Sequence, residues 1–323
     1  MTKKYKVAIA KGSEYQSTFK ALNLIKDQVK EKLVAKKAKQ IFLKANWVQF
    51  RQDWLPITKL DTLRALIAFF QTLGDFSITV GDATPTVFGW NGKTLLAQAN
   101  YQVLENEYKG VRVVDLNDFP AKERFVVRTL DGKRPIRLYE PILDTDFLVS
   151  VAKIKTHDVF ANTLSLKNVA IGCAFWQDKI WFHTVGLNDP REEKPDKESW
   201  YRQILPMMNY NFYAGAKASY PDLAILDGVV AMEGDGPGNG TPVNLGVTLA
   251  SIDALSADMV ATKIMGFSLE EIPYLDILND ERQPQMEVVG EKIDQFNYHF
   301  KPEKNYQYHK TNKEAVLKLI NLD

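Results

Sequence analysis

The chain has 323 residues, 45% hydrophobic and 25% charged, so it can bury a large core and is not a disordered polypeptide. Its 41 basic and 40 acidic residues leave a formal charge of +1, which excludes a general attraction to nucleic acid. No run approaches the ~20 apolar residues of a membrane-spanning helix, and the first residues lack the apolar core of a signal peptide. We therefore expect a cytoplasmic protein without a nucleic-acid or membrane partner.

In the first half, apolar strand-like runs alternate with helical patterns. The sequence predicts strands at 6–12, 40–48, 76–86 and 111–118, and helices at 18–38, 61–74 and 93–110. Thr58 is the expected cap of the second helix. Polar and apolar residues alternate at 125–140, which predicts half-exposed antiparallel strands or an excursion from the main sheet.

The second half continues the alternation. Strands are expected at 144–157, 220–232 and 246–251, and helices at 162–172, 198–218 and 252–267. Asn162 or a neighbour should begin the first of these helices, and Pro206 should kink or divide the second. The fold class is therefore α/β, with a mostly parallel, helix-covered sheet in two closely packed lobes. We expect a body at 1–290, a charged lid or excursion at 177–200, and a peripheral tail at 291–323.

Four apolar strands end in polar side chains. Their polar ends are Lys44 with Asn46, Asp82 with Thr84, the stretch from Lys153 to His157, and Asp227. In open parallel sheets, ligands bind outside the carboxyl ends of the strands, so the four ends together predict a site. The alternative is that each residue merely begins a solvated loop.

Lys153, Lys155 and His157 occupy alternate positions and should share one face of a strand. At a spacing of about 6.6 Å, two ammonium groups repel by roughly 2.5 kcal/mol at an effective dielectric near 20. The pair therefore favours either a bound phosphate or carboxylate, or one lysine whose lowered pKa suits a base or nucleophile. Alternatively, the lysine tips diverge into water.

The residues after this strand carry further polar groups. Thr163 and Lys167 lie one helical turn apart, and Lys167 and Asn168 could return toward the strand end. Thr156 precedes His157 on the strand itself. A threonine near the start of a helix could help to bind an anion together with unpaired backbone N–H groups.

The glycine-rich run Glu233 to Gly240 does not fit a nucleotide-binding loop, because a strand rather than a helix follows it. A tight turn that brings Glu233 and Asp235 near the strand ends is one interpretation, and a plain surface turn is the other. Asp258 lies on an otherwise apolar helix face, so its carboxylate needs a partner. That partner is a basic group of the site, a metal or a backbone amide.

Metal and redox centres have little support in the sequence. Cys173 is the only cysteine, so we expect no intrachain disulfide and no iron–sulfur cluster held by this chain. A divalent metal held by Asp227, Glu233, Asp235 or Asp258 is one option, although the nearby lysines favour an anionic ligand. His183 lies among aromatic residues and could reach the pocket from the lid.

These motifs resemble the bacterial and archaeal "domain of unknown function 362" family over roughly 6–290. The matching patterns are Lys44 with Asn46, Gly81 with Asp82, the segment from Lys153 to Asn168, the segment from Asp227 to Pro237, and the helix containing Asp258. Some relatives carry a ferredoxin-like iron–sulfur segment, which this chain lacks, so the resemblance implies a redox role only with a partner protein. A weaker likeness, through the strand-to-turn segment 81–86, is to the nickel-pincer lactate racemase family.

Two functions follow as expectations. The first is an enzyme for a small phosphate- or carboxylate-bearing substrate, with candidate catalytic residues Lys155, His157, Lys167 and Asp258. The candidate substrate-binding residues are Lys44, Asn46, Asp82, Lys153, Thr156, Thr163, Asn168, Asp227, Glu233 and Gly234. The second is a non-catalytic ligand-binding or accessory protein for a redox or cofactor-assembly system, favoured by the lack of an obvious nucleophile with a base.

Overall fold

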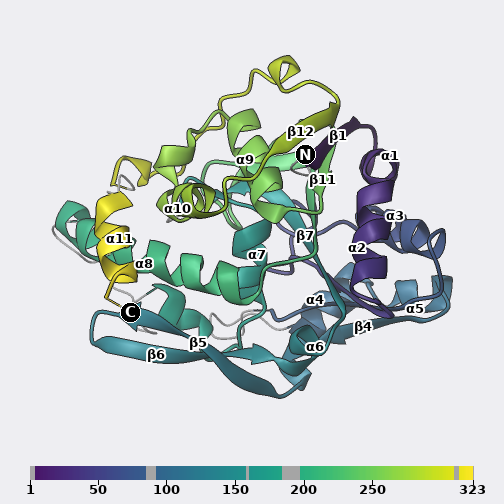
Figure 1. Ribbon diagram of the computed structural model, residues 1–323, viewed down its shortest axis with the longest axis horizontal. Coiled ribbons are helices and arrows are strands. Elements are labelled where there is room, and N and C mark those ends of the chain that lie inside the picture. The colour runs from purple at the N-terminus through teal and green to yellow at the C-terminus, as the bar shows by residue number, and fades with distance from the viewer. Residues whose placement is uncertain (1–3, 85–91, 158–159, 184–196, 309–312, 323) are drawn as a thin grey trace.

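The computed structural model describes residues 4–84, 92–157, 160–183, 197–308 and 313–322. A long twisted sheet runs through the body and helices cover both of its faces (Figure 1). The predicted α/β class with a mostly parallel, helix-covered sheet is confirmed. Most of the segment 177–200, including residues 184–196, lies outside the described residues, so the expected lid stays a prediction.

The large sheet has ten strands in the described part of the chain. Eight form a continuous path in the order β12 (Met286–Gly290), β1 (Tyr5–Lys11), β11 (Val247–Ser251), β9 (Leu223–Glu233), β7 (Phe147–Thr156), β2 (Gln40–Lys44), β3 (Ser77–Asp82) and β4 (Val111–Asp115). The short strands β8 (Asn162–Thr163) and β10 (Thr241–Val243) pair with β7 and β9. Along the path, β11 alone pairs antiparallel with both of its neighbours, so the other seven strands point the same way.

The chain order reverses between β2 and β7. From β2 the chain proceeds through β3 to β4 on one side, whereas β7 is followed by β9 on the other. In open α/β sheets, such a switch point leaves a crevice outside the carboxyl ends of the two strands. The polar residues at the ends of β2 and β7 lie at this crevice.

Strand β7 divides the apolar core in two because its side chains alternate between faces. Phe147, Val149 and Val151 belong to one core, whereas Leu148 and Ile154 belong to the other. The first core packs under α1 (Glu14–Leu24), α2 (Lys26–Ala35), α3 (Leu60–Gln71), α4 (Gly92–Ala99) and α5 (Val103–Glu107). The second packs under α7 (Ser165–Gly172), α8 (Lys197–Ala218), α9 (Ala254–Ile264), α10 (Pro273–Arg282) and α11 (Lys313–Ile320).

Several element boundaries differ from those predicted. The helices expected at 18–38 and 93–110 are each divided, into α1 with α2 and α4 with α5. Thr58 does not cap α3; its hydroxyl donates to the carbonyl of Val151 and accepts from the amide of Asn46, which fixes the loop after β2. Asn162 belongs to β8 rather than to the start of α7. Pro206 lies within α8 and does not divide it, so the kink stays a prediction.

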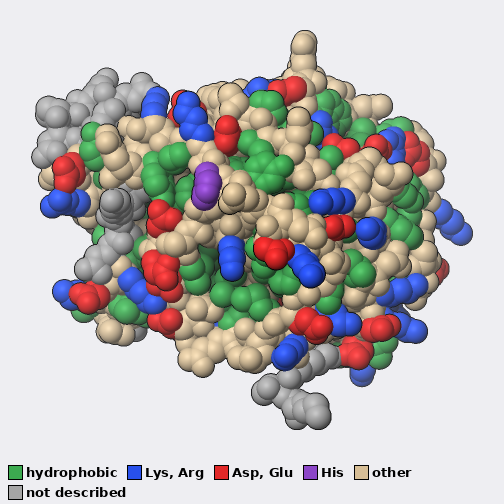
Figure 2. Space-filling view, turned by 90° about the horizontal axis from the view of Figure 1, so that it is seen from above, with side chains coloured by type: hydrophobic (Ala, Val, Ile, Leu, Met, Phe, Trp, Pro, Cys, Tyr) green, Lys and Arg blue, Asp and Glu red, His purple; other side chains and the backbone are tan. Residues whose placement is uncertain are grey.

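The stretch at 125–140 agrees with both of its interpretations, because it forms half-exposed antiparallel strands that lie outside the main sheet. Strands β5 (Ala121–Thr129) and β6 (Gly132–Tyr139) pair antiparallel in a separate sheet, joined to β7 by the short helix α6 (Glu140–Leu143). This hairpin packs against α8 at the lower edge of Figure 1. On the face of the molecule in Figure 2, acidic and basic side chains are interspersed, as the near-zero net charge leads one to expect.

Candidate functional site

A pocket of about 740 Å³ opens at the carboxyl ends of β2, β3 and β7. It is lined by eight of the predicted site residues: Lys44, Asn46, Asp82, Lys155, His157, Thr163, Lys167 and Asn168. The volume lies within the range of ordinary ligand sites. The structure therefore brings these eight side chains to one crevice, at the switch point of the sheet.

Lys44 and Asp82 end neighbouring parallel strands and form a buried ion pair. The Nζ atom of Lys44 lies 2.9 Å from Oδ1 of Asp82 and donates to Oδ1 of Asn168 and to the carbonyl of Ala45. Asp82 in turn accepts from the amides of Trp47 and Ala83. Because both groups are satisfied by protein partners, the pair organises the pocket floor.

The approach of Lys44 to α7 requires a glycine at the end of that helix. A Cβ atom on Gly172 would lie 2.2 Å from Nζ of Lys44, closer than any real contact. Asn168, one turn earlier on α7, donates through Nδ2 to the Ser150 hydroxyl on β7 and accepts from Lys44 on β2. The helix thus connects the two strands on either side of the crevice.

Lys155 is buried at the end of β7, where its Nζ donates to three neutral oxygens. They are Oδ1 of Asn46 at 2.8 Å and the carbonyls of Pro56 and Pro237 at 3.0 and 3.3 Å. Burial, then the positive charges of Lys167 and Lys153, hold the pKa of Lys155 well below its usual range. The predicted direction of the shift agrees, but burial rather than repulsion is its main cause.

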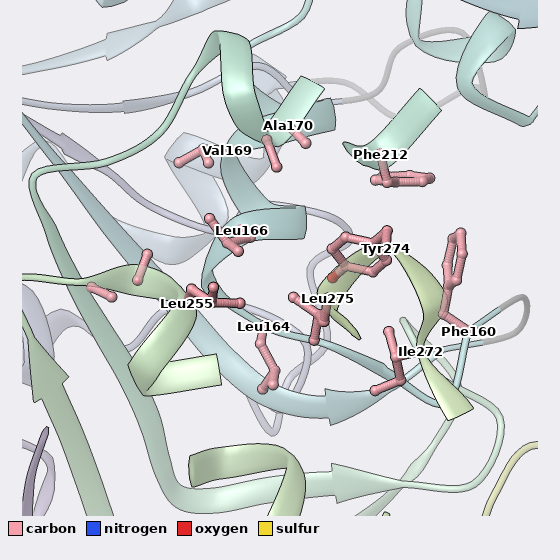
Figure 3. Close-up of a cluster of buried hydrophobic side chains, with 14 of the residues drawn as sticks. Phe160, Leu164, Leu166, Val169, Ala170, Phe212, Leu255, Ile272, Tyr274 and Leu275 are labelled. Atoms are coloured by element: carbon pink, nitrogen blue, oxygen red, sulfur yellow. The ribbon is translucent and has the colours of Figure 1, made fainter. Parts of the chain in front are cut away.

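Lys167 and His157 form a close pair in the pocket wall. Nζ of Lys167 lies 2.8 Å from Nε2 of His157, and both residues are buried. The ammonium also lies over the rings of Phe212 and Phe160, at 4.9 and 5.9 Å from their centroids. These rings belong to the apolar cluster under α7, where Figure 3 shows them beside Tyr274.

Lys153 and Asp227 do not line the pocket. They face each other on β7 and β9, and their side chains form a 2.9 Å ion pair with no solvent exposure. The hydroxyl of Thr62, from α3, also donates to Asp227. The structure therefore places both residues in the interior of the sheet–helix interface, beneath the site predicted to contain them.

Asp258 lies outside the pocket and caps α7. Its two carboxylate oxygens each accept a 2.9 Å hydrogen bond, from the amides of Ser165 and Leu166. Of the three partners considered for this carboxylate, the backbone amide is the one found. Burial raises the pKa of Asp258 to about 8, while these two amides act in the opposite direction.

The remaining predicted residues support loops. The hydroxyl of Thr156 donates to the carbonyl of Gly234, and the amide of Gly234 donates to the carbonyl of Lys301. Glu233 accepts from the amide of Lys301. None of Thr156, Glu233 and Gly234 is among the described residues that line the pocket. Asp235 does line it, together with the rest of the glycine-rich turn up to Asn239.

The chain contributes pocket residues that sequence reasoning missed. Lys179 is buried in the wall, and Glu303, Lys304 and Asn305 line the pocket from the C-terminal segment, which was expected to be peripheral. Asp258 was predicted to need a partner because it is a charged residue among apolar ones. Lys179 is likewise a charged residue within an aromatic run, and the same signal could have identified it. His183 reaches the pocket, as proposed.

The described pocket lining contains more lysines than carboxylates. Five lysines face three carboxylates there: Lys44, Lys155, Lys167, Lys179 and Lys304 against Asp82, Asp235 and Glu303. The lining is therefore more basic than the chain as a whole, whose formal charge is +1.

The carboxylates proposed for a divalent metal do not gather. Asp227 pairs with Lys153, Asp258 caps α7, and Glu233 accepts from a backbone amide. Within the described ranges, no three His, Cys, Asp or Glu side chains are placed to share a metal ion. Cys173 is buried, and burial raises the pKa of its thiol to about 12.

Comparison with known proteins identifies the family. The model of the "domain of unknown function (DUF362)" family matches residues 41–263, which include every pocket residue contributed by β2, β3, β7 and α7. This chain belongs to the DUF362 family. The resemblance in the sequence motifs is thus confirmed over more than half of the chain.

Two individual proteins are also similar. The thylakoid-associated protein sll1697 of Synechocystis sp. is 32% identical over 143 residues, which are 44% of this chain and 40% of that protein. The chain thus matches less than half of this relative's length. The lactate racemase apoprotein from Thermoanaerobacterium thermosaccharolyticum superposes with a TM-score of 0.49 at 15% identity, covering 82% of this chain and 57% of the other.

No helix within the described residues has both the length and the apolar character required to cross a bilayer.

Proposed function

We propose that this DUF362 protein is an enzyme that binds a small anionic substrate, bearing phosphate or carboxylate, at the carboxyl ends of its parallel strands. The observation that carries the proposal is the gathering of Lys155, Lys167 and His157 in one pocket with an excess of lysines over carboxylates. A pocket whose described lining has more lysines than carboxylates attracts an anionic ligand. A cytoplasmic location remains part of this proposal.

Lys167 and His157 are the proposed acid–base pair. Nζ of Lys167 and Nε2 of His157 lie 2.8 Å apart, a distance at which an ammonium can donate to the Nε2 lone pair of a neutral imidazole. If both groups were protonated, two positive charges would repel each other at this distance. An anionic substrate offsets that repulsion, so its binding makes a proton available for general-acid transfer.

Lys155 is the proposed anion anchor. Its weakest contact, 3.3 Å to the carbonyl of Pro237, is with the glycine-rich turn at the pocket rim. A substrate oxygen can replace this carbonyl as the third acceptor. Because a negative charge favours the ammonium form, an anion should restore the depressed pKa of Lys155 and draw a proton from solvent.

A second candidate is a non-catalytic binding or accessory protein that carries the same anionic ligand for a redox or cofactor-assembly partner. The observation in its favour is that no serine or cysteine is found among the described lining residues, so a covalent mechanism through either side chain has no support there. The ligand-binding role of Lys155 and Lys167 is common to both candidates.

Native and denaturing mass spectrometry of freshly purified protein, with elemental analysis of the same sample, tests ligand binding. We expect a bound anion that is absent from Lys155→Met and Lys167→Met but retained by Lys32→Met, which removes a lysine outside the pocket. Circular dichroism and urea unfolding would establish that the variants are folded. Undiminished occupancy in both pocket variants would contradict the proposal.

Turnover separates the two candidates. The molecule identified by mass spectrometry is incubated with the protein in D₂O and followed by NMR. Conversion, or exchange of its protons, that depends on His157 supports the enzyme. Stoichiometric binding that His157→Gln leaves intact, with neither conversion nor exchange by the wild type, supports the carrier.

A further inference from the structure

Lys179 occupies a second cationic position in the pocket. The residue lies in the 3₁₀ helix Lys179–His183 and is only 3% exposed. Its Nζ donates to the carbonyl of Ala83, after β3, at 2.5 Å and to the carbonyl of Gly172, at the end of α7, at 3.3 Å. Two acceptors leave one of the three ammonium protons without a partner among the described residues.

Lys44, the neighbouring cation, differs from Lys179 because all of its ammonium protons already have acceptors. Its ammonium has Asp82, Asn168 and the carbonyl of Ala45 within 2.9 Å, which uses all three of its protons. In the described structure, the ammonium of Lys179 donates hydrogen bonds only to neutral carbonyls. The charge of Asp82 acts on it through space and raises its pKa. Lys179 is therefore the cation at this end that retains a donor for a ligand.

The two cationic positions belong to different parts of the pocket. Lys155 is held by the Asn46 side chain and by the carbonyls of two prolines. Lys179 is held instead by the carbonyls of Ala83 and Gly172. A pocket of about 740 Å³ is also much larger than one phosphate or carboxylate needs. A single small anion held by Lys155 would leave the third ammonium proton of Lys179 without an acceptor among the described residues.

We propose that Lys179 binds a second anionic group of the ligand, so that the substrate class is a dianion with separated charges, such as a dicarboxylate. This inference rests on the proposed function, because Lys155 and Lys167 are to hold the first anionic group. It adds the requirement for two charges and assigns the second to a residue at the junction of β3 and α7. The middle of the ligand then spans the crevice between β2 and β7.

Protonation supports the assignment. Burial lowers the pKa of Lys179 to about 8, with Asp82 acting in the opposite direction. The ammonium form is thus the larger fraction at neutral pH, and it is lost as the pH rises through this value. Binding of the second anionic group should weaken over the same range.

Isothermal titration calorimetry with succinate, glutarate and adipate, against butyrate, valerate and hexanoate, tests the proposal. Each monocarboxylate supplies a hydrocarbon chain with one charge. In the wild type, at least one dicarboxylate should bind about tenfold or more tightly than its monocarboxylate counterpart, as one charge-assisted hydrogen bond provides. In Lys179→Met, that advantage should disappear while monocarboxylate affinity stays the same. Lys32→Met should behave as the wild type.

The outcomes are distinct. If monocarboxylates and dicarboxylates bind the wild type equally, or if Lys179→Met weakens both classes equally, Lys179 is not a second anion-binding residue. If neither class binds but the co-purified ligand has one charge, the inference is also wrong, while the proposed function stands. If no anion binds by either experiment, the proposed function itself fails.

A second measurement covers the case in which Lys179→Met does not fold. The affinities of the preferred dicarboxylate and its monocarboxylate are compared in wild-type protein between about pH 7 and about pH 9. The ratio of dicarboxylate affinity to monocarboxylate affinity should fall toward one as Lys179 loses its proton. A ratio that is constant over this range would overturn the inference, because the carboxylates themselves do not titrate there.

Discussion

Lys153 and Asp227 lie directly opposite each other on the parallel strands β7 and β9, where they form a 2.9 Å ion pair with no exposure to solvent. Two residues later, Lys155 lies opposite Met232 because the register of β9 shifts between the two positions. One lysine therefore receives a carboxylate partner inside the fold, and the other reaches the pocket with neutral partners only.

Removing Lys153 should destabilise the fold strongly. In Lys153→Met, the Asp227 carboxylate would stay buried without its cation, at a cost of about 3–5 kcal/mol in the free energy of unfolding. Urea unfolding followed by circular dichroism measures this loss. The double variant Lys153→Met with Asp227→Leu should recover much of it, because no charge is then left buried. A single variant as stable as the wild type would contradict the structural role.

Asp258→Asn should weaken the cap of α7 without abolishing anion binding. The carboxyl group of Asp258 has two oxygens that can accept in either protonation state, whereas an amide side chain has one, so either the Ser165 or the Leu166 amide loses its partner. We expect a loss of about 1–3 kcal/mol in unfolding free energy. Anion affinity should be unchanged at a temperature where the variant is folded. Loss of anion binding by the folded variant would instead show that Asp258 takes part in the binding site.

Asp258 should also make stability depend on pH. Its pKa is about 8 in the folded chain and about 4 in the unfolded chain, so between these values the folded state binds more protons. The contribution of this group is therefore fully present below about pH 4 and is lost as the pH rises through about 8. The difference in unfolding free energy between wild type and Asp258→Asn, measured in urea at several pH values, should shrink in that direction.

Gly172→Ala should disturb the pocket more than the fold. The added methyl group would overlap Nζ of Lys44, so the ammonium would have to leave Asp82 or Asn168. We expect anion affinity to fall about tenfold, by calorimetry, as one charge-assisted contact is lost. Gly74→Ala, at the end of a helix remote from the pocket, is the matched control. Equal affinity in both variants would show that the Lys44 contacts are dispensable.

Anion binding should be accompanied by proton uptake at Lys155. Its pKa is depressed in the ligand-free chain, and a bound anion favours the ammonium form. Calorimetry in buffers of different ionisation enthalpy should therefore show a net uptake of protons on binding. This proton uptake should grow as the pH rises toward the pKa of Lys155 in the complex. Lys155→Met should abolish the proton uptake that is due to this residue. Binding with no buffer dependence in the wild type would argue against a neutral Lys155.

Local patterns were sufficient to predict the architecture and the edge of the sheet at which the pocket opens. Apolar strands alternating with amphipathic helices predict a helix-covered parallel sheet, because each element must bury its apolar face. The polar residues Lys44, Asp82 and Lys155 at the ends of apolar runs predict a crevice at the carboxyl edge, since parallel strands end together. These conclusions need only the periodicity and the direction of the chain.

The division between pocket and interior depended on tertiary structure. Lys153 and Lys155 have the same local pattern, yet only the register of β9 places Asp227 beside one of them. Asp258 meets the amides of α7 across more than ninety residues of sequence. Lys179 joins the site because α7 and β3 present their carbonyls to it. The sequence determined which residues carry charge. The packed fold decided which long-range partners compensate each charge, and therefore which charges remain available to a ligand.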